Sequence, residues 1–150
     1  RLLLRLADEG DVAAIARAAE TASTTRISAS VANQVRWWQE YRYGLWVLTP
    51  HESGQIIGWC GLKPGADPAH PEIMFGLEAA SRGQGLATEA ARSVVTYALA
   101  LPGVSSVWGA TVPTNAASVA VLRRIGMSLE SEGPLDGVHS LIFRVKGNGI

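Results

Sequence analysis

The chain has little of what several classes of protein require. Its 150 residues include a single cysteine, Cys60, which excludes an internal disulfide and any metal site built on two cysteines. The three histidines, His51, His70 and His139, lie far apart and lack zinc-type spacing, so no metal site is expected. No run of about 18 apolar residues is present, and no membrane-spanning helix is expected.

The chain also has no excess of positive or negative charge. Thirteen basic and thirteen acidic residues give a formal net charge of zero, and the arginines are scattered, with Arg123-Arg124 as the adjacent pair. A nucleic-acid partner usually requires a basic patch, so none is expected. The length and the 47% hydrophobic content instead predict one globular domain over residues 1–150, soluble and cytoplasmic. Because the chain begins with Arg1 rather than Met, a few preceding residues are expected.

The apolar pattern predicts both strands and helices. Strands are expected at residues 2–6, 45–49, 55–62, 72–77, 104–112, 128–132 and 139–145, and helices at 12–19, 31–41, 86–101 and 116–125. Asp8 is expected to cap the first helix with Asp11 three residues on, and residues 21–30 are expected to form a loop. This order predicts an α/β fold of the α+β type, with a mixed, mostly antiparallel sheet of about six to seven strands and about four flanking helices.

The most informative segment is a glycine-bearing turn, Arg82-Gly83-Gln84-Gly85, that leads into the helix-forming run Leu86-Ala87-Thr88-Glu89-Ala90. Glycines permit positive φ, and the unpaired N–H groups at a helix start attract phosphate. A Walker loop would need Gly-Lys-Ser/Thr, but Leu86 follows Gly85. A dinucleotide fingerprint would need Gly or Ala where Thr88 stands, and a β-meander is expected before the turn instead of a parallel unit.

A third pattern fits the turn. Arg82-Gly83-Gln84-Gly85-Leu86-Ala87 matches Arg/Gln-x-x-Gly-x-Gly/Ala, the acyl-coenzyme A pyrophosphate loop of the GCN5-related N-acetyltransferases (GNAT). A second signature agrees: Asn115-Ala116-Ala117-Ser118, then a helix ending in Gly126-Met127, where the family usually has Gly-Phe. The chain resembles this superfamily along essentially its whole length. It most resembles the branch of bacterial ribosomal-protein N-terminal acetyltransferases, in which the loop runs into Ala-Thr-Glu-Ala.

The resemblance implies that acetyl-CoA is the cofactor. The N–H groups from Gly83 to Thr88 would hold its pyrophosphate, and Arg82 would add a charge nearby. The pantetheine arm would run along Phe75, Gly76 and Leu77, and an N–H near Phe75 would stabilise the oxyanion. Gly76 suits that place because its missing side chain permits close approach of another backbone. The pyrophosphate loop thus comprises Gly83, Gln84, Gly85, Leu86, Ala87 and Thr88.

The implied reaction is acyl transfer from a thioester to a deprotonated amine. At pH 7 deprotonation costs an α-amine about 1 kcal/mol and a lysine-like amine about 4–5 kcal/mol, so an N-terminal substrate needs only a weak base. Glu72 is the candidate base, acting through a water; the alternative is an exposed strand-end carboxylate. Ser118 is the candidate proton donor to the thiol sulfur, although Asn115 and Ser118 also suit helix capping. Glu89, in the first helical turn, is expected to be structural.

The acceptor is less defined. In the family the region around the second helix borders the acceptor site, so Trp38 and Tyr43 are candidate substrate contacts, with core packing as the alternative. The expected acceptor is the amine of a protein or peptide N-terminus, or a small amine. Two alternatives stay open: a non-catalytic acyl-CoA-binding module, and transfer of a longer acyl group, which would need room beside Met74 and Gly76. A homodimer is also compatible with the sequence.

Overall fold

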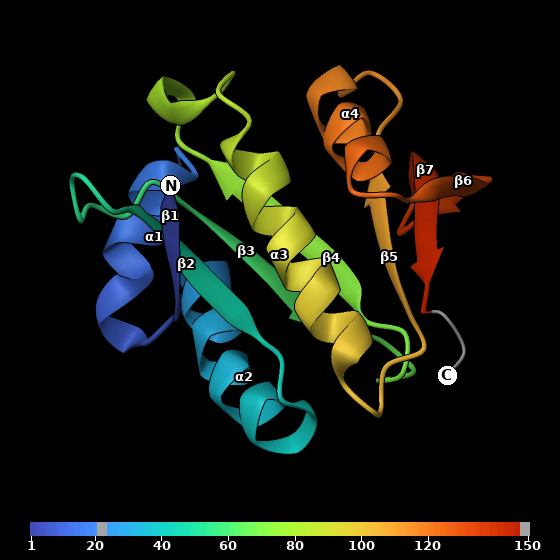
Figure 1. Cartoon of the computed structure of the whole chain (residues 1–150), viewed down its shortest axis with the longest axis horizontal. Coiled ribbons are helices and arrows are strands. Elements are labelled where there is room, and N and C mark those ends of the chain that lie inside the picture. Colours follow the sequence, from blue (N-terminus) through green and yellow to red (C-terminus); the bar gives the residue numbers. More distant parts are fainter. Residues whose placement is uncertain (21–23, 148–150) are drawn as a thin grey trace.

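The computed structural model describes residues 1–20 and 24–147. Its elements follow the predicted order of strands and helices along the chain (Figure 1). The strands are β1 (Leu2–Leu6), β2 (Leu45–Pro50), β3 (Gly58–Lys63), β4 (Glu72–Leu77), β5 (Ser106–Thr111), β6 (Ser128–Leu135) and β7 (Val138–Lys146). The α-helices are α1 (Val12–Ala18), α2 (Thr25–Tyr41), α3 (Leu86–Ala100) and α4 (Ala116–Arg124). Short 3-10 turns at Glu9–Asp11 and Ala79–Ser81 precede α1 and α3.

The strands form one seven-stranded sheet in the order β1-β2-β3-β4-β5-β7-β6. Every neighbouring pair is antiparallel except β4 and β5, which run parallel. The parallel pair arises because α3 crosses over between these two strands, and Figure 1 shows α3 lying across the sheet. The predicted fold class, a mixed and mostly antiparallel sheet with four helices, is confirmed.

Two apolar clusters lie on opposite faces of the sheet. On one face α3 packs with Ala90, Val94 and Ala98 against strand residues that include Leu48 and Cys60. On the other face Ile15 of α1 and Val31 of α2 pack against Leu45 and Val47 of β2. Val47 and Leu48 are neighbours on one strand and point to different clusters, as strand alternation requires. Burial raises the pKa of the Cys60 thiol, so this side chain stays protonated within the α3 cluster.

The first half of α2 differs from the prediction. Residues 21–30 were expected to form a loop, but the helix already begins at Thr25, while residues 21–23 lie outside the described part of the chain. Ile27 packs against the cluster that holds Val31, so tertiary burial stabilises a Ser- and Thr-rich segment whose intrinsic helix propensity is weak. The predicted start of the first helix at Val12 is correct, but the reciprocal capping box of Asp8 and Asp11 closes the 3-10 turn before α1 and not α1 itself.

Candidate functional site

The parallel strands β4 and β5 meet at their N-terminal ends and then separate. Within the described residues, the pairing of these strands consists of one position, Glu72 opposite Trp108. Beside it, the backbone N–H of Trp108 donates to the Pro71 carbonyl at 3.1 Å, and its indole Nε1 donates to the His70 carbonyl at 3.0 Å. Beyond this anchor, in the described part of the chain, no strand pairs with the β5-facing edge of β4, which creates a notch in the middle of the sheet.

The peptide groups that face the notch follow from the pairing of β4 with β3. In an antiparallel pair, residues alternate between those whose N–H and C=O point to the partner and those that point away. The N–H of Glu78 donates to the Ile57 carbonyl at 2.8 Å, and this bond fixes the alternation. Gly76 therefore directs its peptide groups to β3, whereas Phe75 and Leu77 direct theirs into the notch.

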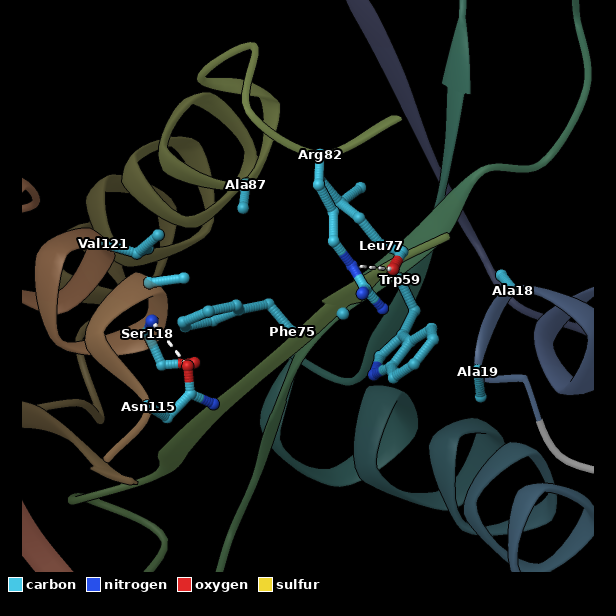
Figure 2. Close-up of a pocket in the computed structure, with 12 residues that line it drawn as sticks. Ala18, Ala19, Trp59, Phe75, Leu77, Arg82, Ala87, Asn115, Ser118 and Val121 are labelled. Carbon is cyan, nitrogen blue, oxygen red and sulfur yellow. Dashed lines mark hydrogen bonds between the residues drawn. The ribbon is translucent and has the colours of Figure 1, made fainter. Parts of the chain in front are cut away.

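A cleft of about 440 Å³ lies at this notch. Its walls come from the end of α1, from β3 and β4, and from the first turns of α3 and α4 (Figure 2). The lining residues are Ala18, Ala19, Trp59, Phe75, Gly76, Leu77, Arg82, Ala87, Asn115, Ala117, Ser118 and Val121. The structure thus brings residues of both predicted signatures, around Arg82 and around Asn115, to one cleft.

The glycine turn has the backbone conformation that glycine permits. Gly83 and Gly85 both have φ of +78°, in the left-handed region that other residues rarely adopt. Gly85 is the N-cap of α3, and the first intrahelical bond runs from the Glu89 N–H to the Gly85 carbonyl. The N–H groups at the helix start thus have no intrahelical acceptor and suit an anion. Leu86 and Thr88 are buried, so these two offer backbone groups rather than side chains.

Arg82 lies between the turn and the notch. Its Nε donates to the Leu77 carbonyl at 3.1 Å, and its guanidinium is 4.0 Å from the Glu20 carboxylate. Figure 2 shows this side chain reaching from the turn toward β4. The side chain is 60% exposed, so a phosphate at the turn can reach its charge from solvent.

A polar network supports the segment between β4 and the turn. The Glu78 carboxylate accepts from Arg17 Nη1 of α1 at 2.7 Å and from Ser81 Oγ at 3.0 Å. The hydrogen bond from Arg17 holds the pKa of the Glu78 carboxyl below its usual range. Arg17 also donates to the Ile56 carbonyl at 2.6 Å, which ties α1, the end of β4 and the approach to β3 together. Sequence reasoning did not identify this network.

Asn115 and Ser118 lie at the start of α4 and both line the cleft. Asn115 is the N-cap: its Oδ1 accepts from the Ser118 N–H at 3.1 Å. Asn115 therefore caps α4, as the alternative interpretation expected, and it also faces the cleft. The Ser118 hydroxyl is not needed for this cap, because the bond uses its backbone N–H.

Glu72 does not line the cleft. It begins β4, about 10 Å of strand away from Phe75 at 3.3 Å per residue. Its carboxylate is 3.1 Å from Lys63 Nζ on β3, and its side chain is 15% exposed. The alternation of β4 places Glu72 on the same face as Gly76, opposite the face that α3 covers. The interpretation as a freely exposed carboxylate is wrong, because Glu72 is ion-paired and largely covered.

Neither of the two aromatic residues suggested as substrate contacts lines this cleft. Tyr43 is 1% exposed, and its hydroxyl donates to the Pro68 carbonyl at 3.0 Å. It is a core residue, and the prediction of a substrate contact is corrected. Trp38 packs edge-to-face on Trp46, with 6.5 Å between ring centroids, and Trp46 in turn packs on Tyr97 of α3. Trp38 therefore belongs to an aromatic row that links α2, β2 and α3.

Trp59 is the aromatic residue that the sequence analysis missed. It lies opposite Gly76 in the β3–β4 register and lines the cleft. A Cβ added to Gly76 would lie 2.3 Å from Trp59 Cζ2, so the missing side chain makes room for the indole. The contact gives Gly76 a reason that the sequence did not suggest, beside the expected approach of another backbone. A glycine inside a strand was the available signal, but the partner could not be identified without the register.

The comparisons with known proteins agree with this geometry. A family model described as an acetyltransferase (GNAT) domain matches residues 1–128, and the chain therefore belongs to the GNAT acetyltransferase family. The membership confirms the resemblance at the level of the family and defines the protein as an N-acetyltransferase. Within the described residues, none of the helices is both long and apolar enough to cross a membrane.

Solved structures share the fold over nearly the whole chain at low sequence identity. A GNAT-family acetyltransferase from Bordetella pertussis is 23% identical, with a TM-score of 0.82 over 96% of this chain and 95% of that one. A ribosomal L7/L12 α-N-protein acetyltransferase, solved with coenzyme A, is 18% identical, with a TM-score of 0.80 over 99% and 96%. The aminoglycoside acetyltransferase AAC(6')-Ib, also solved with coenzyme A, is 17% identical, with a TM-score of 0.75 over 97% and 95%.

Proposed function

We propose that this protein transfers the acetyl group of acetyl-CoA directly to a primary amine, with both substrates bound at once. The observation that carries the proposal is the free edge of β4, which leads from the Glu72–Trp108 anchor to a glycine turn with two left-handed residues. A ligand with a phosphate at one end and amide groups along its length matches both features. Two structural neighbours were solved with coenzyme A, which supports the same ligand class.

The residues at the cleft fit each part of that ligand. The N–H groups between Gly83 and Thr88 would hold the pyrophosphate, and Arg82 would add a positive charge. The notch-facing peptide groups of Phe75 and Leu77 would pair with the amides of the pantetheine arm. Arg82 would release the Leu77 carbonyl for this purpose, since both contacts use the same edge of β4.

The thioester supplies an activated acetyl group. Residues of the chain would position this group and move protons to and from the reacting atoms. The amine nitrogen bonds to the carbonyl carbon, the carbon–sulfur bond breaks, and the leaving sulfur takes a proton. The Phe75 N–H points into the notch and would stabilise negative charge on the carbonyl oxygen. The Ser118 hydroxyl would return the proton to the sulfur. Glu72 would accept the amine's proton through water, about 10 Å of strand from Phe75.

A protein or peptide N-terminus is the first candidate acceptor, and a small amine is the second. An α-amine is easier to deprotonate than a lysine-like amine, so an N-terminal acceptor needs only a weak base. Both acceptor classes occur among the neighbours, one named for an α-N-protein substrate and one for aminoglycosides. We place the N-terminal acceptor first because the sequence resembles the ribosomal-protein branch of the family.

Two measurements test the proposal in sequence. Calorimetry with acetyl-CoA should show binding at sub-millimolar concentration, and failure of the folded protein to bind would refute it. An acetylation screen over N-terminal peptides, polyamines and aminoglycosides, with free thiol as the readout, then identifies the acceptor class. Binding without thiol release in every arm would instead favour the non-catalytic acyl-CoA-binding module.

A further inference from the structure

The indole of Trp59 occupies the space next to Gly76 at the cleft. The two residues are cross-strand partners, and a Cβ on Gly76 would lie 2.3 Å from Cζ2 and 2.4 Å from Cη2 of the ring. Such distances mean that the ring lies directly against the Gly76 backbone. The pair behaves as one unit, because a larger residue at position 76 would displace the indole.

Two aromatic rings define the cleft from opposite faces of the sheet. Phe75 belongs to the face covered by α3, whereas Trp59 packs with the cluster beneath α1 and α2. Figure 2 shows the Phe75 ring extending toward Ser118 and the Trp59 indole extending toward Ala19. The wall on the α1 side is therefore made of the indole and two methyl side chains, Ala18 and Ala19.

The acyl end of the bound ligand would lie beside this wall. On the proposed function, on which this inference rests, the phosphates bind at Gly83 and Gly85 and the arm runs along β4 toward Phe75. The part of the cleft near α4 is then taken by the arm and by Ser118. A chain longer than acetyl would have to extend to the other side of β4, where Trp59 stands.

We infer that Trp59, seated on Gly76, sets the acyl-chain length that the enzyme accepts and restricts it to acetyl. The space beside Gly76 that a longer acyl group would need is filled by the ring. One methylene in an apolar pocket changes discrimination by about 10- to 200-fold, so a wall of this kind suffices for selectivity. Replacing the indole by a smaller side chain should open a pocket bounded by Ala18 and Ala19.

The main test measures binding of acyl-CoA and needs no knowledge of the acceptor, which enters only in a control. Calorimetry gives the dissociation constants of acetyl-CoA and butyryl-CoA for the wild type, Trp59→Ala and Trp59→Phe. The wild type should bind acetyl-CoA at least about tenfold more tightly than butyryl-CoA. Trp59→Ala should reduce that ratio by about tenfold or more, chiefly through tighter binding of butyryl-CoA. Trp59→Phe keeps an aromatic ring for folding and should give an intermediate ratio.

Controls separate this inference from the proposed function and from general loosening of the fold. Trp46→Phe removes an indole from the α3 face, away from the cleft, and should leave the ratio unchanged. An unaltered ratio in the Trp59 variants, or a wild type that binds both acyl-CoAs equally, overturns the inference while acetyl-CoA binding still supports the function. A Trp59 variant that alters only the acceptor's KM overturns it too and assigns Trp59 to the acceptor side. If the wild type does not bind acetyl-CoA, both the inference and the proposed function are overturned.

Discussion

The Nε atom of Arg82 donates to the carbonyl oxygen of Leu77 at 3.1 Å, so a side chain of the glycine turn holds an acceptor on the free edge of β4. The same guanidinium is largely exposed and lies at the cleft. On the proposed function, Arg82 would exchange this carbonyl for a phosphate of the bound ligand.

Arg82→Ala should weaken coenzyme A binding about tenfold or more, because a hydrogen bond to a charged group contributes about 1.5–3 kcal/mol. Calorimetry with coenzyme A measures the change. Arg92→Ala is the matched control: Arg92 lies on the exposed side of α3 and donates to the Arg124 carbonyl at 2.9 Å. Equal affinities for the two variants would remove Arg82 from the cofactor site.

Gly83→Ala should lower both folding stability and coenzyme A affinity. Its φ of +78° costs an alanine about 1–2 kcal/mol, although an added Cβ would meet nothing within 4 Å. Gly126→Ala is the matched control, since Gly126 has φ of +95° and equally open space after α4. Urea unfolding should show a similar loss for both variants, whereas only Gly83→Ala should weaken binding. A loss of affinity in both would mean that strain anywhere loosens the site.

Glu72→Gln should reduce turnover by about 10²- to 10⁴-fold and leave coenzyme A affinity unchanged, because a general base acts on the amine and not on the cofactor. The rate of free-thiol release with the acceptor from the screen measures turnover. Glu130→Gln is a suitable control, as Glu130 is also ion-paired on this sheet, 2.5 Å from Arg144 Nε. Unchanged turnover in Glu72→Gln would exclude Glu72 as the base.

Ser118→Ala should lower turnover by about 10²-fold or more with little effect on stability, since the α4 cap uses the Ser118 backbone N–H. Asn115→Ala should instead destabilise the fold by about 0.5–2 kcal/mol through loss of the cap. Asn115→Ser keeps a capping oxygen, and any loss of coenzyme A affinity in this variant reports on the cleft. Full activity of Ser118→Ala would exclude the serine as proton donor.

The ion pair of Asp11 and Arg5 makes the free energy of unfolding depend on pH in the acid range. The hydrogen bond from Arg5 Nη2 to Asp11 Oδ1, at 2.8 Å, lowers the pKa of the Asp11 carboxyl. Its contribution is therefore complete above the unfolded pKa of about 3.9 and is lost as the pH falls through the lower folded pKa. Asp11→Asn removes the charge that pairs with Arg5 and should cost about 0.2–1 kcal/mol at pH 7, as for a partly exposed ion pair, and less at pH 3. A cost that urea unfolding shows to be constant with pH would contradict this assignment.

Element order was predictable because apolar periodicity is local and strong in this chain. The strand at residues 72–77 and the start of α3 at Leu86 agree with the prediction. β6 extends further than expected, through Gly133 and Pro134, because it pairs with β7 up to a turn at Asp136-Gly137. β6 is an edge strand of the sheet, and an edge strand tolerates a proline that a central strand would not.

The candidate site was predictable where it consists of backbone and unpredictable where it depends on register. The conformation of Gly83 and Gly85 was predictable from the sequence, since few other residues adopt positive φ. Trp59 could not be assigned to the cleft from the sequence, because its place there depends on the register that sets it opposite Gly76. Tyr43 was misassigned for a related reason: nothing local shows that its hydroxyl reaches the Pro68 carbonyl.

The notch between β4 and β5 divides the hydrogen-bonded ladder into a four-stranded part, β1 to β4, and a three-stranded part, β5 to β7. A ligand lying along Phe75 and Leu77 would supply the missing rungs on one side and so become a structural component of the sheet. Cofactor saturation would then be linked to cohesion of the fold, by about 2.7 kcal/mol at a concentration one hundred times Kd. Cells that deplete the cofactor would leave the protein less resistant to unfolding as well as idle.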